Sequence, residues 1–197
     1  MNLPLHKLAD AEVASHEVND LIKVGPISGF QEFLPEEQAI FDEVVATIAR
    51  HYTRAGAVSI ATPLVERNEV LTAKGGAINK EIYGLRRLSE SDDGSARDLG
   101  LKFDLTVPLA RYVAQHQSDL TFPLRRQQID RVYRGERPKS GRYREFIQAD
   151  LDIVGRNDLS LTADAEPPAI INGQLPSARS ARRRGIPAIR SIEITLR

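Results

Sequence analysis

Residues 131–154 read RVYRGERPKSGRYREFIQADLDIV, and this stretch decides the fold that we expect. From residue 144 to residue 154 two kinds of side chain alternate. One set is apolar and comprises Ile147, Ala149, Leu151 and Ile153. The other set comprises Phe146, Gln148, Asp150 and Asp152. Because successive strand residues point to opposite faces of a sheet, the pattern predicts a strand with one apolar, buried face and one largely polar face.

The two aspartates make the polar face informative. Aspartate is a poor strand former, and two like charges at alternate positions repel one another on the same surface. One interpretation is the solvated outer face of an antiparallel sheet, which is common. The alternative, which the aspartates favour, is a face that meets a cationic or hydrogen-bond-donating partner.

The residues before this strand predict a β-hairpin rich in arginine. Residues 131–137 and 142–144 are extended segments, and the Pro/Gly-containing loop 138–141 joins them. Eight basic residues lie between Arg125 and Arg144, and arginine suits planar, bidentate contact with phosphate or carboxylate. A solvated basic hairpin is one interpretation. Cationic and anionic groups on one sheet indicate instead a zwitterionic ligand together with a polyphosphate.

A second alternating stretch lies at residues 101–107. Its apolar members are Leu101, Phe103, Leu105 and Val107. Its polar members are Lys102, Asp104 and Thr106. We therefore predict another strand over these residues, followed by a helix from Pro108 to about His116, because proline is favoured in the first turn of a helix.

An amphipathic helix is predicted from Pro35 to about Tyr52. Glu36 and Glu37 suit its positive N-terminal end, and apolar residues then recur every four positions. Gly56 ends this helix, and a short strand at residues 58–61 is expected to follow.

Composition excludes several classes of protein. The chain has 197 residues, 27 basic and 27 acidic, which argues against a protein that mainly coats nucleic acid. It has no cysteine, so disulfide scaffolds, thiolate zinc sites and cysteine nucleophiles are excluded. Its four histidines are scattered without ligand spacing, so we expect no protein-held metal. The sequence contains no apolar run long enough to predict a membrane span. We expect a cytoplasmic protein.

The C-terminal residues differ from the rest of the chain. Residues 167–197 hold six arginines, one acid (Glu193) and four of the eleven prolines, without sustained apolar periodicity. We therefore expect an irregular, disordered tail here. An RNA-binding arm is the functional alternative.

Several ordered motifs resemble one family, the histidyl-tRNA synthetases of the class II aminoacyl-tRNA synthetases. Residues 134–138 and 141–152 resemble motif 2, and residues 104–111 resemble the histidine-binding segment. Residues 28–35 resemble the family's N-terminal opening, and the helix and strand ending at Pro63 are similar to motif 1, the dimer-forming element. The resemblance implies an α/β protein of the α+β type, mainly an antiparallel sheet flanked by helices, as the N-terminal part of the catalytic core. It assigns residues 26–166 to that core, 1–25 to an extension and 167–197 to a divergent tail.

The resemblance also implies roles for individual residues. Asp104, Thr106 and Gln148 would hold the ammonium end of L-histidine. Asp152 would accept a hydrogen bond from the imidazole. Arg134 would bridge the substrate carboxylate and the α-phosphate of ATP, as the catalytic residue. For ATP itself, Glu136 and Arg142 would contact the nucleotide, and Phe146 would stack on adenine.

The activity implied is that of a histidine–tRNA ligase, which forms histidyl-adenylate from L-histidine and ATP and transfers histidine to tRNA(His). Mg²⁺ would screen the pyrophosphate, and the family implies a homodimer. The later segments of the family's core are absent, so we expect this truncated chain not to complete aminoacylation alone. Two alternatives stay open: a non-catalytic regulatory subunit of ATP phosphoribosyltransferase in histidine biosynthesis, and an RNA-binding fragment.

Overall fold

The structure is a computed structural model that describes residues 24–73, 75, 80–86, 99–139, 141–157, 159–183 and 192–196. Its main sheet has the strand order β1-β4-β5-β6. These strands are β1 (Val58–Ser59), β4 (Leu124–Tyr133), β5 (Glu145–Val154) and β6 (Ile192–Leu196). β4 and β5 are antiparallel, whereas β1 runs parallel to β4 and β6 parallel to β5. The strand predicted over residues 144–154 is therefore confirmed. The hairpin is present as an antiparallel pair, but its predicted bounds are wrong, because residues 134–137 and 142–144 belong to the connection between β4 and β5.

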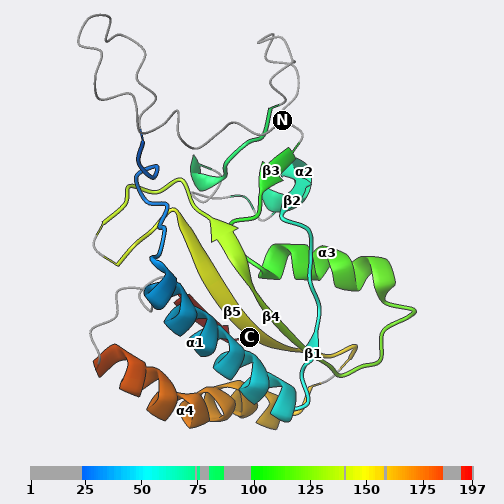
Figure 1. The fold of residues 1–197 in the computed structure, drawn as a ribbon. Coiled ribbons are helices and arrows are strands. Elements are labelled where there is room, and N and C mark those ends of the chain that lie inside the picture. Colours follow the sequence, from blue (N-terminus) through cyan, green and yellow to red (C-terminus); the bar gives the residue numbers. More distant parts are fainter. Residues whose placement is uncertain are drawn as a thin grey trace, which may run out of the picture.

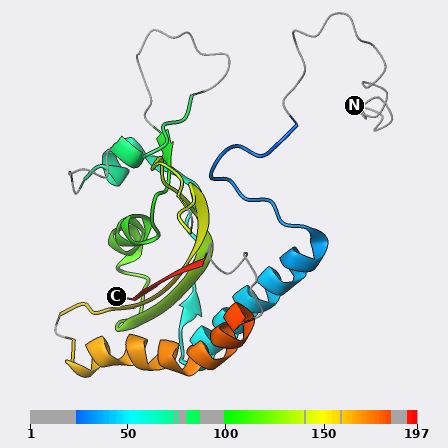
Figure 2. The same cartoon turned by 90° about the vertical axis from the view of Figure 1, so that its left-hand side faces the viewer.

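A small antiparallel sheet and four helices complete the fold. The sheet pairs β2 (Val65–Arg67) with β3 (Leu99–Leu101). The helices are α1 (Pro35–Arg54), α2 (Asn68–Leu71), α3 (Thr106–His116) and α4 (Thr162–Arg183). Figure 1 shows β4 and β5 as the long central strands, with α1 and α3 beside them. In Figure 2 these strands are curved, with α3 on the inner side of the curve and α1 on the outer side. The predicted mixed α/β fold, a sheet flanked by helices, is confirmed.

Helix α1 begins and ends where its sequence predicts. Pro35 is its first residue, and the carboxylate of Glu37 accepts a hydrogen bond of 3.2 Å from the backbone N–H of Leu34. Such a carboxylate satisfies a donor that the helix itself leaves unpaired. Beyond the C-terminus Gly56 has φ of 80°, a left-handed conformation that favours glycine.

The apolar face of β5 packs against α1 and α4. The buried residues of this core are Ile48, Tyr52, Ala57, Ala149 and Leu151. Val44, Ile129, Ile170, Ile171 and Ile194 pack around them. The Tyr52 hydroxyl also donates a hydrogen bond of 3.1 Å to the carbonyl of Ala149. One face of β5 is thus buried as its alternation predicts.

The predicted strand at residues 101–107 is wrong beyond Leu101. β3 ends at Leu101, and α3 begins at Thr106, before the expected start at Pro108. The chain turns here because a carboxylate oxygen of Asp104 accepts a hydrogen bond of 3.0 Å from the backbone N–H of Val107. This contact satisfies a backbone donor in the first turn of α3, so the alternation of residues 101–107 reflects a turn and a helix start. The helix ends at His116, as predicted.

The expectation of an irregular tail is corrected for residues 167–183 and 192–196. Residues 162–183 form α4, and residues 192–196 form β6. Tertiary packing explains the difference, since Ile170, Ile171 and Ile194 lie against the core and offset the poor helix propensity of the prolines. Residues 184–191 lie outside the described residues, as does nearly all of the expected N-terminal extension 1–25. No helix in the described ranges is long and apolar enough to cross a membrane.

Candidate active site

The second face of the β4–β5 hairpin carries most of the residues that the sequence predicts for a site. Four cross-strand pairs form this face: Arg126 with Asp152, Gln128 with Asp150, Asp130 with Gln148, and Val132 with Phe146. Directly paired residues of antiparallel strands lie on the same face. Most of the polar members are buried, namely Arg126, Gln128, Gln148, Asp150 and Asp152. A solvated outer face is therefore wrong, and the polar side chains are held inside the protein.

Arg126 lies at one end of this polar face, near the start of β4. Its side chain is 0% exposed, and its Nη1 lies 2.6 Å from an oxygen of Asp152 and 4.0 Å from one of Asp150. Its Nη2 donates to the side-chain oxygen of Gln128 at 2.6 Å and to the carbonyl of Leu105 at 3.1 Å. Burial lowers the pKa of Arg126 from its ordinary value, and the neighbouring carboxylates, Asp152 first, oppose that shift. One guanidinium thus joins β4, β5 and the turn before α3.

The turn before α3 places Asp104 and Thr106 beside the Arg126 end of the polar face. Asp104 is buried, and its charge acts on Arg126. The Thr106 hydroxyl oxygen is buried and has no hydrogen-bond partner among the described residues. A buried hydroxyl is normally hydrogen-bonded, so this one suits a polar ligand.

Lys102 holds the start of this turn against the sheet. Its ammonium is 0% exposed and lies 2.6 Å from a carboxylate oxygen of Asp130. It also donates a hydrogen bond of 3.2 Å to the carbonyl of Thr62. Lys102 and Asp104, two polar members of the alternating stretch 101–107, are thus both buried.

Arg134 follows β4 and reaches the same turn from the other end of the face. Its Nε donates a hydrogen bond of 3.1 Å to the carbonyl of Phe103, next to Asp104. Its guanidinium carbon lies 4.8 Å from the centre of the Phe146 ring, and its Nη1 lies 3.3 Å from the carboxylate of Glu193 in β6. Arg134 therefore already combines an aromatic and a carboxylate partner.

Glu136 and Arg142 lie apart from this centre, on the loop between β4 and β5. They form an ion pair of 2.6 Å, and the side chain of Arg142 is 63% exposed. Lys139 and Arg142 pair their backbones across the loop. Arg144 stabilises the loop, because its Nε donates a hydrogen bond of 3.1 Å to the carbonyl of Glu136.

The structure thus brings together the centre of the predicted set and leaves two members at its edge. Gln148 and Asp152 lie on the polar face of β5, Asp104 and Thr106 lie in the turn that Arg126 contacts, and Arg134 contacts the same turn with Phe146 beside it. Glu136 and Arg142 lie on the adjacent loop. Carboxylates, an amide and a guanidinium thus surround one face of the hairpin and the turn before α3.

Sequence reasoning missed Arg126 as a member of the site. It counted this residue only among the basic residues before the hairpin, and it did not begin a strand at Leu124. The sequence gives little signal for it, because residues 125–128 are polar at every position and show no alternation.

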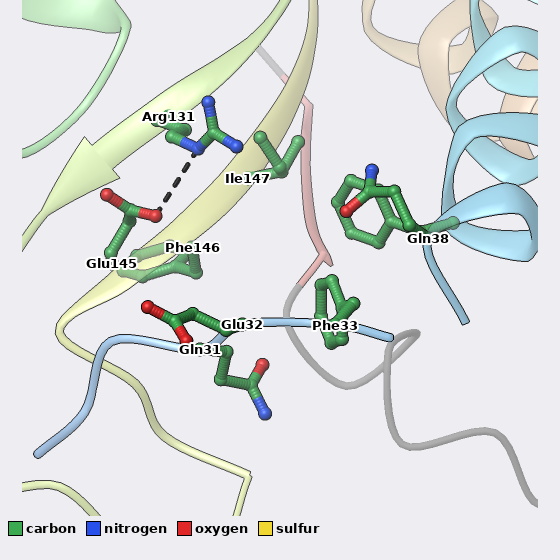
Figure 3. A pocket seen from close by; sticks show the side chains of 9 residues that line it. Gln31, Glu32, Phe33, Gln38, Arg131, Glu145, Phe146 and Ile147 are labelled. Atoms are coloured by element: carbon green, nitrogen blue, oxygen red, sulfur yellow. Dashed lines mark ion pairs between the residues drawn. The ribbon is translucent and has the colours of Figure 1, made fainter. Parts of the chain in front are cut away.

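A hollow of about 300 Å³ lies near one end of this hairpin. Figure 3 shows Arg131, Glu145, Phe146 and Ile147 on one side of it and Glu32, Phe33 and Gln38 on the other. Arg131 and Glu145 form an ion pair of 3.3 Å there. The hollow shares Phe146 with the polar face, but the buried carboxylates and Arg126 do not line it.

The described residues offer no metal site. In these parts of the chain, no group of three or more His, Cys, Asp or Glu side chains is placed to hold a metal ion.

Comparisons with known proteins give the family. A family model described as histidyl-tRNA synthetase matches residues 29–175. The histidine–tRNA ligase of Clostridium tetani is 47% identical over 153 residues, which are 77% of this chain and 33% of that protein. The histidine–tRNA ligase of Nostoc sp. is 50% identical over 162 residues, covering 78% of this chain and 35% of that protein.

Solved structures agree with these matches. The crystal structure of histidyl-tRNA synthetase from Nostoc sp. PCC 7120 aligns with a TM-score of 0.68 at 45% identity, over 79% of this chain and 34% of that chain. A Bacillus halodurans structure described as an ATP phosphoribosyltransferase regulatory subunit/histidyl-tRNA synthetase aligns with a TM-score of 0.66. At 24% identity, that likeness shows a shared fold alone. The chain spans about a third of the length of the curated relatives it matches, and it belongs to the histidyl-tRNA synthetase family.

Proposed function

We propose that the polar face of the β4–β5 hairpin binds L-histidine and ATP, as part of a histidine–tRNA ligase. The observation that carries the proposal is that Gln148 and Asp152 lie on the polar face of β5 and Asp104 lies in the turn that Arg134 contacts, in a chain of this family. The ligase activates L-histidine as histidyl-adenylate and transfers the histidyl group to tRNA(His).

The two ends of L-histidine meet different groups. Asp104, Thr106 and Gln148 bind the ammonium group, and the unpartnered hydroxyl of Thr106 supports this role. Asp152 accepts a hydrogen bond from an imidazole N–H. A site built around such a bond rejects isosteric side chains that lack the donor, because its own buried polar group would then lose its partner.

Arg134 acts at the reacting atoms. The substrate carboxylate attacks the α-phosphorus of ATP, a new carboxyl–phosphate bond forms, and pyrophosphate leaves with the electrons of the broken bond. A guanidinium between carboxylate and α-phosphate holds two repelling anions together and stabilises the charge that develops at phosphorus. The ion pair of Arg134 with Glu193 shows that a carboxylate can reach this guanidinium.

The nucleotide extends from there toward the loop. Phe146 stacks on adenine, while Glu136 and Arg142 contact the rest of the nucleotide. Mg²⁺ would accompany the ATP phosphates and screen the pyrophosphate that leaves.

The assignment extends to the chain as a whole. We place the catalytic-core part at residues 26–166, between an extension at 1–25 and a divergent segment at 167–197. We also expect a cytoplasmic location and a homodimer, as in the family. The regulatory subunit is not favoured, because the relatives of high identity are histidine–tRNA ligases.

Calorimetric titration of the full chain with L-histidine tests the proposal. We expect saturable binding that Asp152→Asn weakens by about tenfold or more. Asp42→Asn, an exposed carboxylate on α1, is the matched control and should bind as the unchanged chain does. A folded chain that ignores both histidine and ATP would refute the proposal. If that chain still bound tRNA with a steep salt dependence, the RNA-binding alternative would replace it.

Catalysis is a separate measurement. Because the chain spans about a third of its relatives, we expect no histidine-dependent exchange of pyrophosphate into ATP from the chain alone. Robust exchange would contradict this expectation and would place the whole activation step within these residues.

A further inference from the structure

Arg126 is a buried cation that the chemistry above does not use. Its side chain is 0% exposed, and burial of an unpaired guanidinium is strongly unfavourable. Its partners are therefore a requirement of the fold. Two of them belong to the proposed histidine site, namely Asp152 and the carbonyl of Leu105, which lies between Asp104 and Thr106.

The geometry of these contacts connects the two ends of that site. Nη1 contacts Asp152 on β5 at 2.6 Å, and Nη2 contacts the carbonyl of Leu105 at 3.1 Å. Nη2 also contacts Gln128 at 2.6 Å, which prevents rotation of the guanidinium. Because the guanidinium is planar and rigid, it fixes the distance between its partners as well as their directions. The imidazole end and the ammonium end of the site are thus set relative to one another by one side chain.

The same contacts bear on specificity. A carboxylate paired with a guanidinium is ionised and can only accept hydrogen bonds. An oriented, acceptor-only Asp152 selects a ring that carries an N–H at that position. Without Arg126, Asp152 would lie close to Asp150 on the same buried face with no guanidinium between them, and the fixed direction would be lost.

We propose that Arg126 is a positioning residue for histidine selectivity, which holds Asp152 as an oriented anionic acceptor at a fixed distance from the turn at residues 104–106. This inference rests on the proposed histidine site, and it adds a residue that touches no substrate atom itself.

The test compares two ligands on the full chain. Calorimetry gives the affinity for L-histidine and for β-(2-thienyl)-L-alanine, whose ring is similar in size but has no N–H. We expect the unchanged chain to prefer histidine, and Arg126→Met to reduce that preference by about tenfold or more. Arg126→Lys keeps the positive charge but lacks the planar guanidinium with its several fixed N–H donors. We therefore expect Arg126→Lys to keep more of the preference than Arg126→Met does.

Arg125→Met is the matched control, because Arg125 is the neighbouring arginine of β4 but pairs with Glu166 outside the proposed site. We expect it to leave the preference for histidine unchanged. Circular dichroism establishes that each variant is folded. Should Arg126→Met alone fail to fold, Arg126→Lys and the double variant Arg126→Met/Asp152→Asn supply the comparison.

Each result decides a different question. If the Arg126 variants reduce the affinity for both ligands by the same factor, Arg126 has only a structural role and the inference is wrong. If loss of Arg126 reduces the preference as much in the Asp152→Asn background as in the unchanged chain, Arg126 does not act through Asp152. If the unchanged chain binds neither ligand, the proposed function fails and this inference fails with it.

Discussion

The two faces of the β4–β5 hairpin are both buried, but for different physical reasons. One face places Ala149 and Leu151 against Tyr52 of α1, and removal of this apolar surface from water stabilises the fold. The other face buries Arg126 and Asp152, which favours folding only while each charge keeps its partner. Stability and ligand recognition thus occupy alternate residues of the same strands, and a substitution should act differently on each face.

The largest expected effect comes from removing one partner of the buried ion pair. Asp152→Ala leaves Arg126 buried without its closest carboxylate, and removal of one partner from such a pair costs about 4 kcal/mol. Urea unfolding followed by circular dichroism measures the change. We expect histidine binding to be lost as well.

The double variant Arg126→Met/Asp152→Ala separates the two effects of that substitution. With both charges removed, we expect part of the stability to return, because the penalty arises from the unpaired guanidinium. Histidine binding should remain lost. A double variant that is less stable than Asp152→Ala would contradict the assignment of the penalty to an unpaired charge.

Leu151→Ala tests the apolar face of β5, at the residue next to Asp152 in the sequence. Leu151 is 2% exposed within the core formed with α1, and a Leu→Ala change in such a core costs about 3 kcal/mol. In the folded chain we expect the preference for histidine over its thienyl analogue to be unchanged. Calorimetry below the unfolding transition checks this, and a changed preference would show that the two faces are not independent.

The division between the faces of β5 could be predicted from the sequence, because alternation of period two is a local property. Helix α1 was predictable for the same reason, from Pro35 and the four-residue spacing of its apolar side chains. The turn at residues 102–106 was not. Its alternation is compatible with a strand, and the deciding contact is the hydrogen bond from the backbone N–H of Val107 to Asp104.

Two further features depended on long-range contacts. The place of Arg126 follows from the register that pairs it with Asp152, which the sequence does not reveal without the start of β4. Helix α4 contains Pro167, Pro168 and Pro176, which count against a helix locally. The packing of Ile170 and Ile171 against the core outweighs that preference.

A smaller effect is expected where the two faces influence one another through Tyr52. Tyr52→Phe removes the hydrogen bond to the carbonyl of Ala149. Near neutral pH this should lower the free energy of unfolding by about 1 kcal/mol. Burial, and then the charges of Asp150 and Asp152, raise the pKa of the Tyr52 phenol far above its ordinary value of 10.0. Above pH 10 the unfolded chain releases this proton while the folded chain keeps it, so stability falls as pH rises.

Urea unfolding between pH 9 and 11 measures this dependence. Each such tyrosine contributes a slope of about 1.4 kcal/mol per pH unit above pH 10. Burial, followed by its hydrogen bond with Glu145, raises the pKa of Tyr133 to about 12, so Tyr133 contributes over part of the same range. Tyr52→Phe should therefore reduce the slope and leave the part due to Tyr133. An unchanged slope would show that Tyr52 is not protonated preferentially in the folded state.

The smallest effect is expected for an ion pair of the same chemistry at the surface. Arg125 contacts both carboxylate oxygens of Glu166, one of them at 3.1 Å, but the two side chains are 36% and 39% exposed. The hydrogen bond from Arg125 lowers the pKa of Glu166, so the pair stabilises the fold above the ordinary pKa of 4.5 and loses that effect as the pH falls. Water and salt screen an exposed pair, so Glu166→Gln should shift the urea midpoint less than any variant above, and 1 M NaCl should abolish the shift. A shift as large as that of Asp152→Ala would mean that burial does not distinguish the two pairs, and the contrast between the faces of the hairpin would lose its physical basis.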